Sequence, residues 1–162
     1  MSDIEVDELV RIEIEREGTE EIIEIALHRD TDMVSHIRGE LKLDANVHIF
    51  EREREEPLAC NLPDRRHLRL LAHSHRVIDV IVRYEHHEKD HRFAPSTTVF
   101  TVLQWAVGKH GYNLDPAIAP KANLILPGAE EPMPRNRTIG SFTTLGSHCL
   151  VVDLTLKDFT NG

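Results

Sequence analysis

The chain has 162 residues, of which 40% are apolar and 29% are charged, and its formal net charge is −9. This length suits one ordinary domain or two very small ones, and the apolar fraction is sufficient to bury a core. No charged start is followed by an apolar stretch of the signal-peptide type, and no apolar run approaches the roughly 20 residues that cross a bilayer. We therefore expect a cytoplasmic protein without membrane contact.

The negative charge is confined to the first half of the chain. Residues 1–75 contain 19 Asp and Glu against 10 Lys and Arg, whereas residues 76–162 contain nine of each. An acidic half repels phosphate backbones, so nucleic-acid binding is disfavoured and contact with a basic protein surface is the more natural use. The alternative is that these carboxylates only keep the protein in solution.

The first half begins with a hairpin pattern. Apolar and charged residues alternate over 10–15, which predicts a strand with one buried face. A turn at 17–19 separates it from residues 22–27, which are rich in β-branched side chains and are typical of the returning strand.

A helix and two strands complete the first half. Asp30 or Thr31 can cap a helix whose apolar positions are Val34, Ile37 and Leu41. Short strands are then expected over 47–50 and 68–72.

The same order of elements starts again in the second half. The pattern predicts a strand over 78–84, a turn rich in His, Glu and Lys, and a shorter strand near 92–94. A helix follows, capped by Ser96, Thr97 or Thr98 and ended by Gly111, with apolar positions at Val99, Val102, Leu103 and Ala106. A strand over 124–126 is followed by a turn at Pro127 and Gly128, and the last strand is expected over 150–156. This repeat predicts two domains, 1–75 and 76–162, joined by a short linker near 73–76.

Residues 121–156 resemble ubiquitin in the order and spacing of their landmarks. Residues 123–128 look like its third strand and the following turn, Arg137-Thr138-Ile139 looks like its Arg-Thr-Leu segment, and residues 150–156 look like its terminal strand. The first half resembles the same fold only by element order. The resemblance implies an α+β protein of two tandem β-grasp (ubiquitin-like) domains, each a mixed sheet packed on one main helix.

A tandem pair with a glycine at its end is similar to the interferon-induced two-domain modifier of vertebrates and to the modifier of bacterial Bil antiphage operons. The resemblance implies four partners: an adenylating activating enzyme, a conjugating enzyme, a deconjugating metalloprotease and a target protein. It also implies covalent attachment through Gly162, with Asp158, Phe159, Thr160 and Asn161 recognised as the tail. The chain itself is expected to have no catalytic activity and to bind no cofactor.

The chemistry of such a tail favours glycine at the last position. The carboxylate must reach ATP, become an acyl adenylate and pass to a cysteine thiolate as a thioester. Glycine has no Cβ to obstruct the attacking nucleophile. The sequence departs from ubiquitin here, because Asn161 precedes a single Gly162 where ubiquitin has two glycines.

Ile125 occupies the position that in ubiquitin centres the apolar surface bound by partners. Its predicted neighbours, Val151 and Asp153, replace the His and Val of ubiquitin. We therefore expect ubiquitin receptors to bind poorly and a private set of enzymes to be recognised.

Other polar and apolar side chains are interpreted as structural. His73, His75, His86, His87 and His91 lie in segments expected to be the linker and a hairpin turn, so solvated histidines are favoured over a metal site. Cys149 begins an apolar run and is expected to be a buried thiol, whereas Cys60 is expected in a loop. Trp105 lies one residue off the apolar stripe and is expected beneath a loop or between the domains.

Two other functions remain open from the sequence. The chain could be a noncovalent β-grasp module that docks a partner through a sheet edge or the Ile125 face. It could also be a sulfur carrier in which Gly162 becomes a thiocarboxylate.

Overall fold

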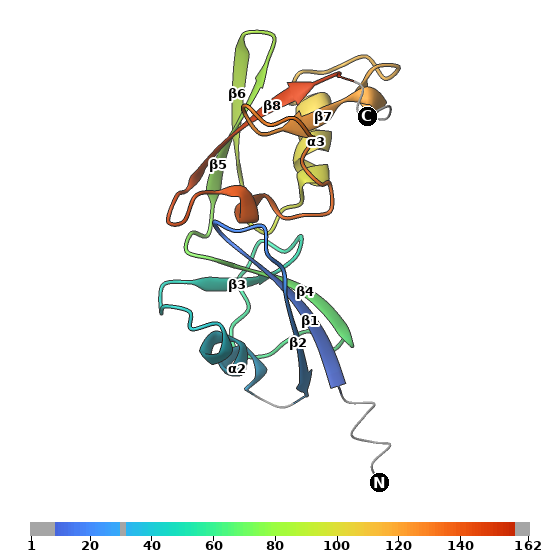
Figure 1. Cartoon of the computed structure of the whole chain (residues 1–162). Coiled ribbons are helices and arrows are strands. Elements are labelled where there is room, and N and C mark those ends of the chain that lie inside the picture. Colours follow the sequence, from blue (N-terminus) through green and yellow to red (C-terminus); the bar gives the residue numbers. More distant parts are fainter. Residues whose placement is uncertain (1–8, 30–31, 158–162) are drawn as a thin grey trace.

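The computed structural model describes residues 9–29 and 32–157, and Figure 1 shows two sheets stacked end to end with a main helix beside each. The first sheet contains β1 (Leu9–Arg16), β2 (Ile23–His28), β3 (His48–Glu51) and β4 (His67–His73), and its helix is α2 (Met33–Glu40). The second contains β5 (Ile78–Tyr84), β6 (His87–Phe93), β7 (Asn123–Ile125) and β8 (Cys149–Thr155), and its helix is α3 (Val99–Val107). Two short 3-10 helices, η1 (Ala119–Lys121) and η2 (Ile139–Phe142), lie in the second half.

The two sheets have the same topology. Their strand orders are β2-β1-β4-β3 and β6-β5-β8-β7. In each sheet the two central strands run parallel, and each edge strand is antiparallel to its neighbour. This mixed sheet with one main helix is the β-grasp arrangement, so the predicted fold of two tandem β-grasp domains is confirmed.

Alternating side chains bury one face of the first sheet. Val10, Ile12 and Ile14 are at most 1% exposed, and they join the core that receives Met33, Val34 and Ile37 of α2. The helix begins at Met33, and the proposed caps Asp30 and Thr31 lie outside the described residues.

The second domain has the larger apolar core. Val99, Val102, Leu103 and Ala106 of α3 are all buried, as the spacing predicts. Thr98 is the N-cap, and its side chain accepts a hydrogen bond from the backbone N–H of Thr101. Burying an apolar stripe of this kind against the sheet is the main stabilising contribution of such a short helix.

Gly111 does not end α3 in a left-handed conformation, so this prediction is wrong. The helix ends at Val107, and Gly108 is its C-cap. The reason for glycine at 111 is close approach, because a Cβ there would lie 2.3 Å from the carbonyl oxygen of Ala106 and 2.4 Å from that of Trp105. By contrast, Gly128 has φ +81° in the turn after β7, as its place in a turn predicts.

The strand β6 is longer than the sequence predicts. It starts at His87 and pairs with the whole of β5, and the turn consists only of Glu85 and His86. The histidines expected in a turn therefore divide between the turn and the exposed strand.

Candidate protein-interaction surface

The terminal strand leads directly to the expected conjugating tail. β8 ends at Thr155, and the backbone N–H of Lys157 donates a hydrogen bond to the Thr155 hydroxyl at 3.1 Å. Gly162 and the tail residues Asp158, Phe159, Thr160 and Asn161 lie outside the described residues, so their role stays a prediction.

The outer face of the second sheet brings together the three residues predicted as a partner-binding surface. Ile125 pairs with Asp153 across β7 and β8, and Val151 is two residues before Asp153 on the same face. Val151 also pairs with Ile81 of β5. All four side chains are half-buried rather than fully exposed. We refer to Ile81, Ile125, Val151 and Asp153 as the sheet face.

Asp153 is neutralised within this sheet face. The Arg83 guanidinium donates through Nε to Oδ1 at 2.7 Å and through Nη2 to Oδ2 at 3.1 Å. This fork-shaped contact is the strong geometry for an arginine and a carboxylate, and the carboxylate raises the pKa of Arg83. The sheet face therefore consists of apolar side chains around an internal ion pair. A cation of a partner would gain little binding free energy from Asp153, because Arg83 already neutralises this carboxylate.

Three carboxylates of the first domain hold backbone amides of the second. Glu15 accepts from the N–H of Thr138 at 3.1 Å, and Glu17 accepts from that of Gly146 at 3.1 Å. Glu53 accepts from the N–H of Thr98 at 2.5 Å and from the Thr101 hydroxyl at 2.8 Å. We call this boundary between the domains the seam.

Glu53 caps the main helix of the other domain. Its carboxylate lies at the start of α3, where free N–H groups and the helix dipole favour a negative charge. Its backbone N–H donates to the carbonyl of Ser96 at 2.9 Å, and its φ of 69° turns the chain toward α3. The sequence suggests no such role, since Glu53 is one of several glutamates in a charged segment.

The seam also has an apolar centre. Leu71 pairs with Phe50 across β4 and β3, and both are fully buried although their neighbours Leu70 and Ile49 face the first core. A Cβ at Gly140 of η2 would lie 2.8 Å from Cδ2 of Leu71. Both faces of β4 are therefore covered, one by α2 and the other by the second domain.

His73 is fully buried at the seam, so the prediction of a solvated histidine is wrong for this residue. Its Nδ1 accepts from the N–H of His75 at 2.9 Å, which places the ring proton on Nε2, 2.8 Å from the Thr143 hydroxyl. Burial lowers its pKa to about 4, although Glu17 at 3.8 Å opposes the shift. The ring is thus neutral near pH 7.

Residues 79–157 match the protein-family model described as BilA ubiquitin-like domain 2. This segment is a ubiquitin-like domain of the BilA type. The match runs from the second residue of β5 to Lys157 and so includes β6, α3, β7 and β8. No curated protein matches the chain.

Within residues 9–29 and 32–157, no three His, Cys, Asp or Glu side chains are grouped so that they could hold a metal ion. Cys149 is exposed at the start of β8, so the predicted buried thiol is wrong, and Cys60 is exposed in a loop.

Trp105 of the BilA-type domain packs against β6 rather than at the seam. Its ring stacks on His91 at 5.2 Å between ring centroids and meets Phe93 edge-on at 5.9 Å.

None of the helices in the described ranges has both the length and the apolar character needed to cross a membrane.

Proposed function

We propose that the chain is a ubiquitin-like protein modifier that partner enzymes activate at Gly162 and attach to target proteins in bacterial antiphage defence. The observation that carries this proposal is the match of residues 79–157 to a BilA ubiquitin-like domain, with a β-grasp fold over the same residues. In this proposal β8 delivers the tail, and residues 158–162 pass into the active site of an adenylating enzyme.

Five chemical steps follow from this assignment. The Gly162 carboxylate attacks the α-phosphate of ATP, which releases pyrophosphate and forms an acyl adenylate. A cysteine thiolate of the activating enzyme displaces AMP to give a thioester, and the acyl group passes to a conjugating enzyme. A target lysine amine then displaces the thiolate and forms an isopeptide bond, which a deconjugating metalloprotease hydrolyses.

The sheet face supports recognition by those enzymes. It presents Ile81, Ile125 and Val151 around the neutralised Asp153. The same face also supports the second candidate, a module that docks a partner without covalent attachment.

The test compares the full chain with a Gly162 deletion. Each is incubated with ATP and any adenylating and conjugating enzymes that are encoded beside it, and the products are measured by intact mass with and without thiol. We expect a thiol-sensitive enzyme adduct and a thiol-resistant target adduct only with Gly162 present. Glu40→Ala, at the exposed end of α2, is the matched control and should retain adduct formation, because it leaves the tail unchanged.

The outcomes separate the candidate functions. Adducts that persist without Gly162 would contradict attachment through this residue. A stable complex that forms equally with and without Gly162, and no adduct in either case, would favour the docking module. A product in which sulfur replaces one carboxylate oxygen would instead indicate a sulfur carrier.

A further inference from the structure

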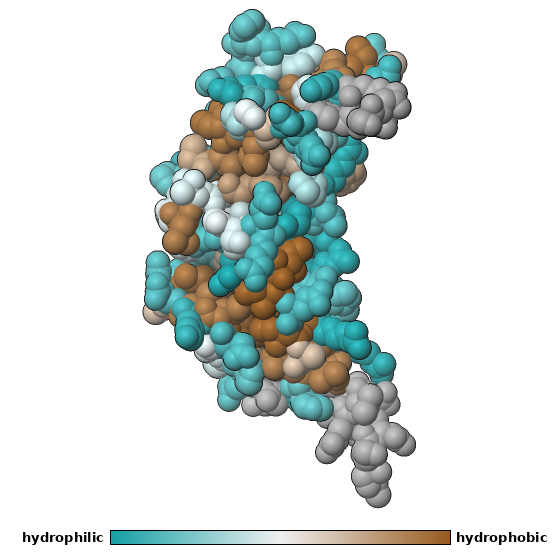
Figure 2. All heavy atoms as spheres, in the orientation of Figure 1, coloured by the Kyte–Doolittle hydropathy of each residue, from teal (hydrophilic) through white to brown (hydrophobic). Residues whose placement is uncertain are grey.

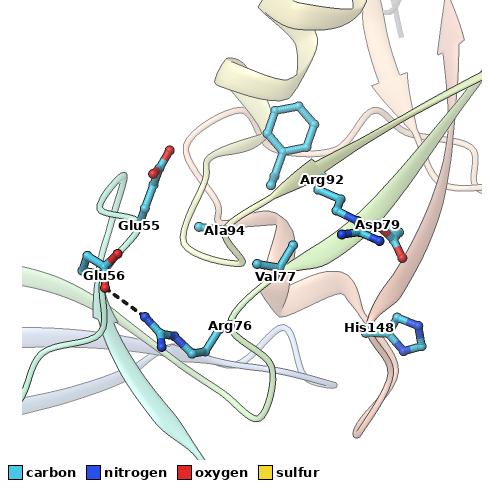
Figure 3. A pocket seen from close by; sticks show the side chains of 9 residues that line it. Glu55, Glu56, Arg76, Val77, Asp79, Arg92, Ala94 and His148 are labelled. Atoms are coloured by element: carbon cyan, nitrogen blue, oxygen red, sulfur yellow. Dashed lines mark hydrogen bonds and ion pairs between the residues drawn. The ribbon is translucent and has the colours of Figure 1, made fainter.

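An open cavity of about 710 Å³ lies at the seam, near the start of β5 and the end of β6 and away from the tail-bearing end of β8. Figure 3 shows Glu55 and Glu56 of the first domain on one side, Asp79 and His148 of the second domain on the other, and Val77 between them. The remaining lining residues are Arg76, Arg92, Phe93 and Ala94. The volume lies within the range of about 300–1,000 Å³ typical of ligand sites.

The cavity walls are held in place by the contacts of the seam. Two residues before Glu55, the backbone and side chain of Glu53 bind Ser96 and Thr98. The Ser96 hydroxyl in turn donates to the carbonyl of Arg54. The segment that carries Glu55 is therefore fixed to the chain just beyond Ala94, and an occupant meets a preformed cavity.

The charges of the cavity are mostly paired internally, with one exception. Arg76 binds Glu56 at 2.9 Å, and Arg92 binds Asp79 at 3.2 Å. Glu55 is exposed and has no ion pair with any residue of the described ranges. One carboxylate thus remains available to an incoming cation.

The floor of the cavity is apolar and accessible. Val77 is 48% exposed in the linker, and Phe93 and Ala94 beside it are half-buried. A side chain with an apolar stem and a cationic end fits this combination, since lysine and arginine lay their methylene groups on apolar surface while the charge stays at the rim.

We propose that this cavity docks a segment of a partner protein in which a lysine or arginine adjoins an apolar side chain. The cation pairs with Glu55, and the apolar side chain covers Val77 and Phe93.

The cavity is continuous with the sheet face, because Asp79 is two residues before Ile81 on the same side of β5. Figure 2 shows that apolar side chains are exposed over both domains in separate areas, with polar side chains between them near the seam. Docking in the cavity does not require Gly162, so the test of docking is independent of the test of conjugation.

The test uses the full isotope-labelled chain and two capped pentapeptides, Gly-Leu-Lys-Leu-Gly and Gly-Leu-Glu-Leu-Gly. We expect the lysine peptide to shift the amide resonances of Val77, Phe93 and Ala94, and the glutamate peptide to leave them unchanged. Glu55→Lys should weaken binding about three- to tenfold, the size expected for losing an exposed ion pair and gaining a repulsion. Val77→Ser should weaken binding by removing the apolar floor.

A matched charge change distinguishes docking from general attraction to an acidic domain. Glu40→Lys makes the same substitution at the exposed end of α2, outside the cavity lining, and should leave the affinity unchanged. Equal weakening by Glu55→Lys and Glu40→Lys would overturn the proposal. So would lysine-peptide shifts spread over residues 9–75, or no shift in the cavity at millimolar peptide.

Discussion

His73 shows how one side chain depends on a neighbour that the local sequence does not contain. It ends β4 beside Ser74 and His75, a polar segment typical of a solvated linker. The ring is nevertheless fully buried, because Thr143 of the second domain binds its Nε2. Local pattern cannot predict this burial, since the covering residue lies 70 positions away.

We expect acid to destabilise the protein through His73. Its pKa of about 4 in the folded state is below the ordinary value of 6.5, so the unfolded chain binds more protons between these pH values. The stabilisation is complete above pH 6.5 and is lost as the pH falls toward 4, by about 3 kcal/mol at most. Glu17, His75 and His48 face the ring and interact with it electrostatically, so a variant is needed to isolate the contribution of His73.

His73→Asn removes the titrating group and keeps an acceptor near the position of Nδ1. The free energy of urea unfolding, measured from pH 7.5 to 4, should fall less steeply in this variant than in the wild type. His87→Asn changes an exposed histidine of β6 and serves as the control. Parallel pH curves for His73→Asn and the wild type would contradict the assignment.

At the scale of elements, alternation predicts the buried strands well and the exposed ones poorly. The alternation predicts β1, β5 and β8 because the buried apolar residues of each strand fall on one face. All of β6 up to Arg92 is exposed, so it has no such alternation. The sequence also gives no signal for the two-residue turn before β6. Glu85 and His86 adopt φ of 47° and 69°, but neither is the Asn or Gly that such a turn favours.

This turn offers a stabilising change. Two central residues with positive φ define a type I′ hairpin, for which Asn-Gly is the preferred pair. We expect Glu85→Asn with His86→Gly to raise the free energy of unfolding by about 1 kcal/mol. Urea unfolding followed by Trp105 fluorescence would measure the gain. Glu88→Asn with Lys89→Gly places the same residues inside β6 and should destabilise instead, whereas equal effects would show that the turn is unstrained.

At the scale of the whole molecule, the seam joins two small domains into one unit. Its carboxylates, such as Glu15 and Glu53, look like solvent-facing residues when each half is considered alone. Glu15 lies on the polar face of an alternating strand, and its donors Arg137 and Thr138 both belong to the second domain. The tandem fold was therefore predictable from the repeated pattern, whereas the contacts between its halves were not.

Glu53→Ala tests whether the seam couples the two domains. The variant leaves the N–H of Thr98 at the start of α3 without its acceptor, which should lower the free energy of unfolding by about 1–2 kcal/mol. Trp105 is the single tryptophan and reports on the second domain, whereas far-ultraviolet circular dichroism reports on both. In the wild type we expect the two probes to give one coincident urea transition, because unfolding either domain exposes the buried groups of the seam. In Glu53→Ala the two midpoints should separate.

Glu56→Ala is the matched control, since it removes only an exposed ion pair with Arg76 and should leave the transitions coincident. Separate transitions in the wild type would show that the two domains are not coupled. Identical behaviour of the two variants would show that the Glu53 cap does not couple them.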